Sequence, residues 1–185
     1  MILSLKEIID MIIMVAFVGF IFSGFIRLKQ THPPKIFEWE NFKFAAYLTA
    51  PALIFHELAH KFVAIGFGFE ATFHAAYFWL ILGTGLRLMG FPFIFFVPAF
   101  VSIPGAVSIA PLQYSMIAFA GPAMNALLWL GAWYYLKNHQ HMGRRKFALI
   151  YLTKQINMFL FIFNMLPIPG FDGSKVFSGL AQAFG

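Results

Sequence analysis

The chain has 185 residues and contains no cysteine; 61% of its residues are hydrophobic and only 11% are charged. A soluble globular protein is excluded because it could not bury that much apolar surface, and disulfides, thiolate nucleophiles and sulfur-ligated metal sites are excluded by the missing cysteine. The net charge of +6 lies in short polar segments with no run typical of nucleic-acid binding, so we expect the lipid bilayer, and no nucleic acid, as a partner.

Four apolar segments are about as long as the roughly 20 residues that a helix needs to cross a bilayer. They are residues 11–26, 44–66, 115–136 and 147–166. The first segment is a retained span rather than a secretory signal, because Glu7 and Asp10 stand where a signal carries basic residues. We therefore predict an all-α, multi-pass integral membrane protein with about four transmembrane helices.

The region between the second and third spans, residues 71–111, is apolar but interrupted by glycines and prolines. A continuous helix is not expected there, so we predict a re-entrant segment at 77–89 and short strands at 93–101 and 106–109. Irregular backbone at membrane depth has to be satisfied by protein or by water. This small membrane-associated element should therefore pack against the helices or line a cavity.

The sequence His56-Glu57-Leu58-Ala59-His60 lies within the second predicted span. Residues four apart share one helix face, so both imidazoles can reach one metal ion. Glu57 is rotated by about 100° from His56 and can address a water on that ion without binding the ion itself. Because ionisable groups inside a membrane span are costly without a function, we interpret these residues as a metal site rather than as a polar helix face.

A catalytic zinc usually takes three protein ligands, and Asp172 is the candidate for the third. It closes a segment rich in proline and glycine, residues 164–173, which follows the last predicted span and can turn a carboxylate back toward the motif helix. Taken alone, the segment is equally compatible with Asp172 capping a short helix over residues 173–183.

Three separated motifs resemble the site-2 protease family of intramembrane zinc metalloproteases. They are His56-Glu57-x-x-His60, Gly121-Pro122-x-x-Asn125 and Asn164-x-x-Pro167-x-Pro169-x-x-Asp172-Gly173. The resemblance covers about residues 44–175 and implies Zn²⁺ as the cofactor, with His56, His60 and Asp172 as its ligands. It also implies Glu57 as the catalytic carboxylate, with Asn125 and Asn164 as polar residues beside the site.

One further substrate contact is expected from the same resemblance. Pro104-Gly105-Ala106-Val107 lies where members of the family present a strand beside the active site. An exposed strand edge could bind an unwound substrate segment through its backbone, so we predict Val107 as a substrate-binding residue.

The predicted function is hydrolysis of peptide bonds in transmembrane protein substrates, with Glu57 as general base and Asn125 stabilising the oxyanion. The alternatives are a membrane zinc transporter and an inactive protease-like binder. We expect one membrane-embedded protease domain over residues 1–185. It comprises a first span and linker at 1–43, a catalytic core at 44–175 and a short C-terminal segment at 176–185.

The membrane orientation has two opposed indications. The linkers at 27–43 and 137–146 hold eight Lys and Arg residues, and the positive-inside rule would place them in the cytosol. Both predicted catalytic motifs lie toward the opposite face. The family resemblance instead implies an active site toward the cytosolic side, which is the orientation we expect.

Overall fold

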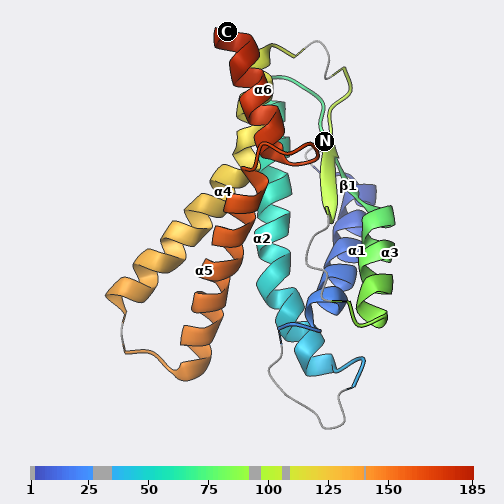
Figure 1. The fold of residues 1–185 in the computed structure, drawn as a ribbon, viewed down its shortest axis with the longest axis vertical. Helices are drawn as coiled ribbons and strands as arrows, with labels where there is room; N and C mark the ends of the chain where they lie inside the picture. The colour runs from blue at the N-terminus through green and yellow to red at the C-terminus, as the bar shows by residue number, and fades with distance from the viewer. Residues whose placement is uncertain (1–2, 27–34, 92–96, 106–108, 140) are drawn as a thin grey trace. The chain divides into compact units, whose positions relative to one another are not determined.

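The computed structural model describes residues 3–26, 35–91, 97–105, 109–139 and 141–185 (Figure 1). The chain is mostly helical, at 72%, with a small two-stranded sheet. Its elements are, in chain order, α1 (Leu5–Phe22), α2 (Trp39–Gly66), β1 (Thr72–Ala75), α3 (Tyr77–Leu88), β2 (Ala99–Ser102), α4 (Pro111–Asn138), α5 (Arg144–Asn164) and α6 (Asp172–Phe184). The predicted mostly helical architecture with a small β element is therefore confirmed.

The elements form two compact units, which are described separately. The first contains residues 1–51 and 73–100, and the second contains residues 52–72 and 101–185. The first unit therefore holds α1, the beginning of α2 and α3. The second holds the remainder of α2 together with α4, α5 and α6.

In the first unit, α1 carries two buried carboxylates that bind the backbone of β1. Glu7 Oε1 accepts from the Phe73 N–H at 2.8 Å, and Asp10 Oδ2 accepts from the Ala75 N–H at 3.4 Å. Asp10 Oδ1 also accepts from the Tyr77 hydroxyl at 2.5 Å. The two acids therefore satisfy backbone donors along one edge of β1, a role that their position before the first apolar run did not indicate.

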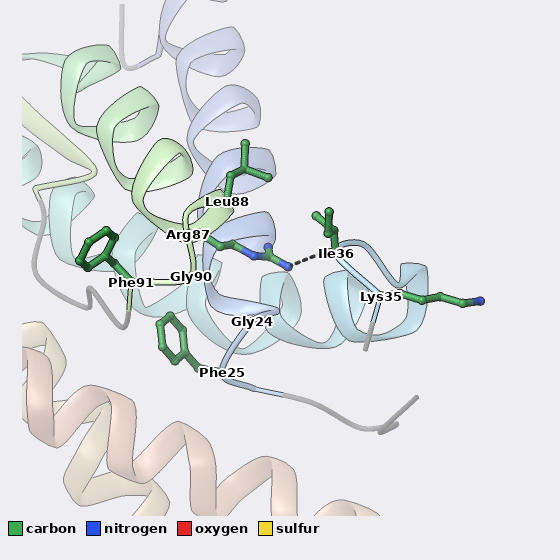
Figure 2. A pocket seen from close by; sticks show the side chains of 8 residues that line it. All are labelled: Gly24, Phe25, Lys35, Ile36, Arg87, Leu88, Gly90 and Phe91. Atoms are coloured by element: carbon green, nitrogen blue, oxygen red, sulfur yellow. Dashed lines mark hydrogen bonds between the residues drawn. The ribbon is translucent and has the colours of Figure 1, made fainter. Parts of the chain in front are cut away.

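A cavity of about 280 Å³ lies at the other end of this unit (Figure 2). Its lining residues are Gly24, Phe25, Lys35, Ile36, Arg87, Leu88, Gly90 and Phe91. Arg87 donates from Nη2 to the Ile36 carbonyl at 2.8 Å, and its guanidinium lies 3.8 Å from the centre of the Phe20 ring. These contacts hold the end of α3 against α1 and against the residues that precede α2.

The sheet differs from the predicted strands in position. β2 coincides only with the end of the predicted strand at 93–101, and residues 92–96 lie outside the described residues. Residues 106–108, including Val107, also lie outside them, so the second predicted strand and its substrate contact remain predictions. β1 was not predicted, because a strand of four residues presents too short a pattern to be distinguished from a loop. α3 occupies the segment predicted to be re-entrant.

In the second unit, α4 packs against both α5 and α6. The start of α4 lies very close to α6, because a Cβ placed on Gly179 would meet the Pro111 carbonyl oxygen at 2.7 Å. Ser115 donates from its hydroxyl to the Val176 carbonyl at 2.9 Å. An apolar cluster of Ala64, Ala71, Ile109 and Ile117 joins the end of α2 to α4.

Within the described part of the chain, α4 and α5 are the two helices long and apolar enough to cross a membrane. Only 6% of the apolar window of α5 is buried inside the protein. The core helix of a soluble protein would be mostly buried, so this exposure favours contact with lipid. Spanning by α1 and α2, which would complete the predicted four, stays a prediction.

Candidate metal centre

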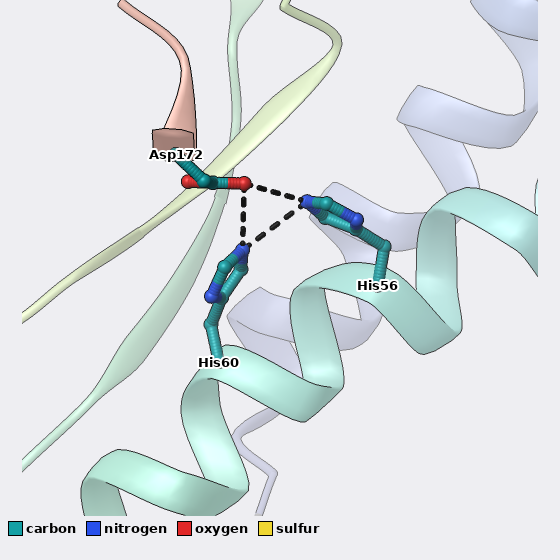
Figure 3. Close-up of side chains that lie close together, drawn as sticks. All are labelled: His56, His60 and Asp172. Atoms are coloured by element: carbon teal, nitrogen blue, oxygen red, sulfur yellow. Dashed lines mark hydrogen bonds and ion pairs between the residues drawn. The ribbon is translucent and has the colours of Figure 1, made fainter. Parts of the chain in front are cut away.

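His56, His60 and Asp172 converge on one point in the second unit (Figure 3). The two histidines are four residues apart on α2, and their rings face each other edge to face at 4.8 Å between centroids. The two Nε2 atoms are 3.1 Å apart, and Asp172 Oδ2 lies 3.1 Å from His56 Nε2 and 3.2 Å from His60 Nε2. The helical spacing and the distant aspartate therefore meet in a triangle of possible metal ligands.

The turn between α5 and α6 carries Asp172 to this point. Gly173 lies against the end of α5, where an added Cβ would meet the Leu166 and Met165 carbonyl oxygens at 2.5 Å. Only glycine permits this approach, which folds the first turn of α6 back onto α5. Phe171 is the N-cap of α6, and Asp172 is its first residue. The alternative in which Asp172 caps this helix is therefore wrong, and its carboxylate turns to the histidines instead.

The Nδ1 atoms of both histidines face oxygen acceptors. His60 Nδ1 lies 2.7 Å from the Ile117 carbonyl oxygen, and His56 Nδ1 lies 2.5 Å from Asn125 Oδ1. A carbonyl oxygen can only accept, so each Nδ1 carries a proton, and each neutral ring presents its lone pair at Nε2. Both imidazoles are therefore oriented as metal ligands, with the outer-shell hydrogen bonds that such ligands usually make.

The donor set fits a zinc ion. Two Nε2 lone pairs and a carboxylate oxygen at 3.1–3.2 Å repel one another unless a proton or a cation lies between them. Tetrahedral donors about 2.0–2.2 Å from a zinc are about 3.3–3.6 Å apart, close to the observed separations. Two imidazoles and one carboxylate are also a common set for a catalytic zinc. The residues therefore suit a zinc ion that keeps a position open.

Asp172 is held in its ionised form. Burial by itself would raise the pKa of Asp172, but the hydrogen bonds and positive charge of His56 and His60 in their protonated form outweigh burial and keep the pKa well below its usual range. The second carboxylate oxygen, Oδ1, lies 3.7 Å from Lys175 Nζ. Asp172 is thus a carboxylate at neutral pH, the form in which it can bind a metal.

Glu57 is buried beside the histidines, with 7% of its surface exposed. Its carboxylate interacts electrostatically with His56, Asp172 and Lys175. It follows His56 directly on α2 and therefore points in a direction about 100° away from that ligand. This placement leaves Glu57 close to the triangle but outside it.

Gly121 of α4 lies against the two imidazoles. A Cβ placed on Gly121 would come within 2.3 Å of His60 Nε2 and 2.6 Å of His56 Nε2. The backbone of α4 therefore forms a wall of the site that has room for the ligand atoms only because residue 121 is glycine. The sequence placed Gly121 in a motif, but it did not show that the glycine faces the histidines.

Comparison with known proteins identifies the family. No family model and no solved structure matches the chain. A curated protein of Methanocaldococcus jannaschii, named "Putative zinc metalloprotease MJ0611", is 35% identical over an alignment of 183 positions, and the match covers 94% of this chain and 84% of that protein. The chain belongs to this zinc metalloprotease family. The match extends over nearly the whole chain, so it includes residues of both units.

Two further predicted site residues, Asn125 and Asn164, differ in how deeply they are buried. Asn125 is fully buried, and its amide contacts His56, the Ala52 carbonyl and Asn157. Asn164 is the last residue of α5 and is partly buried. Contacts of Asn125 and Asn164 with substrate stay predictions.

Sequence reasoning gave no role to two buried polar residues of this unit. Asn157 of α5 has 1% of its surface exposed, and Lys61, which follows His60 on α2, also has 1% exposed. The signal for Asn157 was a polar residue in an apolar span, which marks a functional or packing role without naming its partner. Lys61 also lies in a predicted apolar span, but it directly follows the metal motif, so its signal could not be separated from that of the motif.

Proposed function

We propose that this chain is an intramembrane zinc metalloprotease of the site-2 type, which hydrolyses peptide bonds in transmembrane protein substrates. The observation that carries the proposal is the convergence of His56, His60 and Asp172 beside the buried carboxylate of Glu57. Three ligands that leave a position open, together with a separate carboxylate, are what hydrolysis by a metal-activated water requires. The family relationship supports the same chemistry.

The depth of the site along α4 supports cleavage within the bilayer. α4 is a candidate span of 28 residues that begins at Pro111, and Gly121 is the residue whose backbone lies against the histidine ligands. At 1.5 Å per residue, Gly121 is about 15 Å from the start of the helix. If α4 crosses the membrane, the ligands therefore lie well below the lipid surface. The protein is then a multi-pass membrane protein, with the active site expected toward the cytosolic side.

The chemistry is divided between the metal and the protein. When bound, zinc lowers the pKa of water toward about 7 and polarises the scissile carbonyl. His56, His60 and Asp172 hold the ion, and Glu57 accepts the proton of the attacking water and passes it to the leaving amine. In a helical substrate the peptide carbonyls are hydrogen-bonded internally, so the cleaved segment has to unwind. We therefore expect substrates with helix-weakening residues near the cut.

Removal of the metal provides the direct test of this function. The purified protein in liposomes should cleave a model transmembrane substrate, lose that activity with 1,10-phenanthroline, and regain it when Zn²⁺ is added. The isomer 1,7-phenanthroline, which does not chelate, is the matched control and should have no effect. Cleavage that survives chelation would contradict the zinc mechanism. Zinc flux into liposomes without cleavage of any membrane substrate would favour a transporter.

A further inference from the structure

Asn157 connects α5 to the metal centre through a second amide. Among the described residues of α5, Asn157 is the one that is buried, although it lies within a candidate span. Its Oδ1 accepts from Asn125 Nδ2 at 2.9 Å, and its Nδ2 donates to the Thr153 carbonyl at 2.8 Å. Asn125 Oδ1 in turn lies 2.5 Å from His56 Nδ1. Two amides therefore link a backbone carbonyl of α5 to a ligand histidine of α2.

The direction of every hydrogen bond in this link is fixed by backbone carbonyls. The Thr153 carbonyl can only accept, so the amide nitrogen of Asn157 must face it and the amide oxygen must face Asn125. The Ala52 carbonyl supports the same direction, because it accepts from Asn125 Nδ2 at 3.2 Å, but this bond is longer than the 2.9 Å bond to Asn157. Both hydrogens of the Asn125 amide are thereby used, and its oxygen faces His56.

This direction determines which nitrogen of His56 is available to a metal. An oxygen facing Nδ1 requires a proton there and leaves the lone pair at Nε2, the atom that points to Asp172. If the Asn125 amide were turned over, its NH₂ group would face Nδ1 and would favour the other tautomer. That tautomer places a proton at Nε2, where it would obstruct the metal.

We propose that Asn157 is a positioning residue of the zinc centre: it fixes the amide of Asn125 so that His56 binds metal through Nε2. The inference rests on the proposed function only in taking the three converging residues as metal ligands. It also explains why α5, whose other described residues are partly or fully exposed, carries a buried amide at this position. A residue that only joined α5 to α4 would leave the metal affinity unchanged.

The test compares zinc affinity among variants of the full-length protein in detergent. Asn157→Leu, which removes both hydrogen bonds at similar size, should weaken zinc binding by about 10- to 100-fold in competition with a chelating dye. The Co²⁺-substituted variant should show an altered visible spectrum. Asn157→Asp keeps an acceptor facing Asn125 and should bind zinc more tightly than Asn157→Leu. Thr153→Val is the matched control, because it removes only a hydroxyl bond to the Leu149 carbonyl and should match the wild type.

Circular dichroism identifies the variants that fold. If Asn157→Leu does not fold, Asn157→Ala removes the same acceptor without adding bulk and carries the same expectation. A folded variant of either kind with wild-type zinc affinity and an unchanged Co²⁺ spectrum would overturn the proposal. Failure of the proposed function is a separate result, since the wild-type protein would then bind no stoichiometric zinc.

Discussion

Glu57→Gln should abolish peptide hydrolysis while leaving zinc in place. The amide has nearly the shape of the carboxylate but cannot accept the proton of the attacking water. Glu57 lies outside the triangle of ligand atoms, so metal affinity should stay close to that of the wild type. A positioned general base contributes about 10²- to 10⁴-fold, and we expect a loss of activity at the upper end of that range. The measurements are the cleavage rate of a transmembrane substrate and zinc content.

Glu70→Gln is the matched control for this variant. Glu70 is an exposed acid that follows the end of α2 in the same unit, so its amide should change neither activity nor zinc content. Near-normal cleavage by Glu57→Gln would refute the assignment of Glu57 as the base. Loss of zinc from Glu57→Gln would instead make Glu57 part of the binding site.

Gly121→Ala should eliminate zinc binding, and with it all activity. The new methyl carbon would lie 2.3 Å from His60 Nε2 and 2.6 Å from His56 Nε2, distances that real side chains do not show. Relief requires the imidazoles to move away from Asp172 or α4 to move away from α2, and either movement separates the ligand atoms. A misplacement of about 1 Å is enough to disable a catalytic constellation of this kind.

The same substitution on the same helix provides the control. Gly131 of α4 has open space around its Cβ position, so Gly131→Ala should keep zinc and activity. It should also be slightly more stable, because alanine is favoured over glycine in a helix by up to about 1 kcal/mol. Zinc content of both variants, measured alongside thermal unfolding, separates loss of the site from loss of the fold. Stoichiometric zinc in Gly121→Ala would show that the α4 backbone does not confine the ligands.

The sequence was most informative where function depends on local spacing. Two histidines four residues apart on a helix must share a face, so their common target could be predicted without any knowledge of packing. Asp172 could be predicted because the prolines and glycines before it indicate a turn that can direct a carboxylate toward the motif helix, although the segment taken alone left a capping role equally open. The four long helices α1, α2, α4 and α5 could be predicted from their apolar length, although α1 begins at Leu5, six residues before the predicted span.

The contacts that orient the site could not be predicted in this way. His56 and Asn125 are 69 positions apart, and Asn125 and Asn157 are 32 apart, so their meeting depends on how three helices pack. The same limit applies to Glu7, whose partner on β1 lies 66 positions away. The relative shows that the chain belongs to a zinc metalloprotease family. The resemblance to the site-2 protease family also implies cleavage within the membrane, which the relative does not show. Intramembrane cleavage stays a prediction.

The metal content of the purified protein tests the central claim most directly. Elemental analysis of the wild-type chain should find about one zinc per molecule, and Asp172→Ala should lose most of it, because one of three protein ligands is removed. Absence of any stoichiometric divalent ion from the wild-type protein, or equal zinc in the wild-type protein and Asp172→Ala, would contradict a zinc centre built from His56, His60 and Asp172.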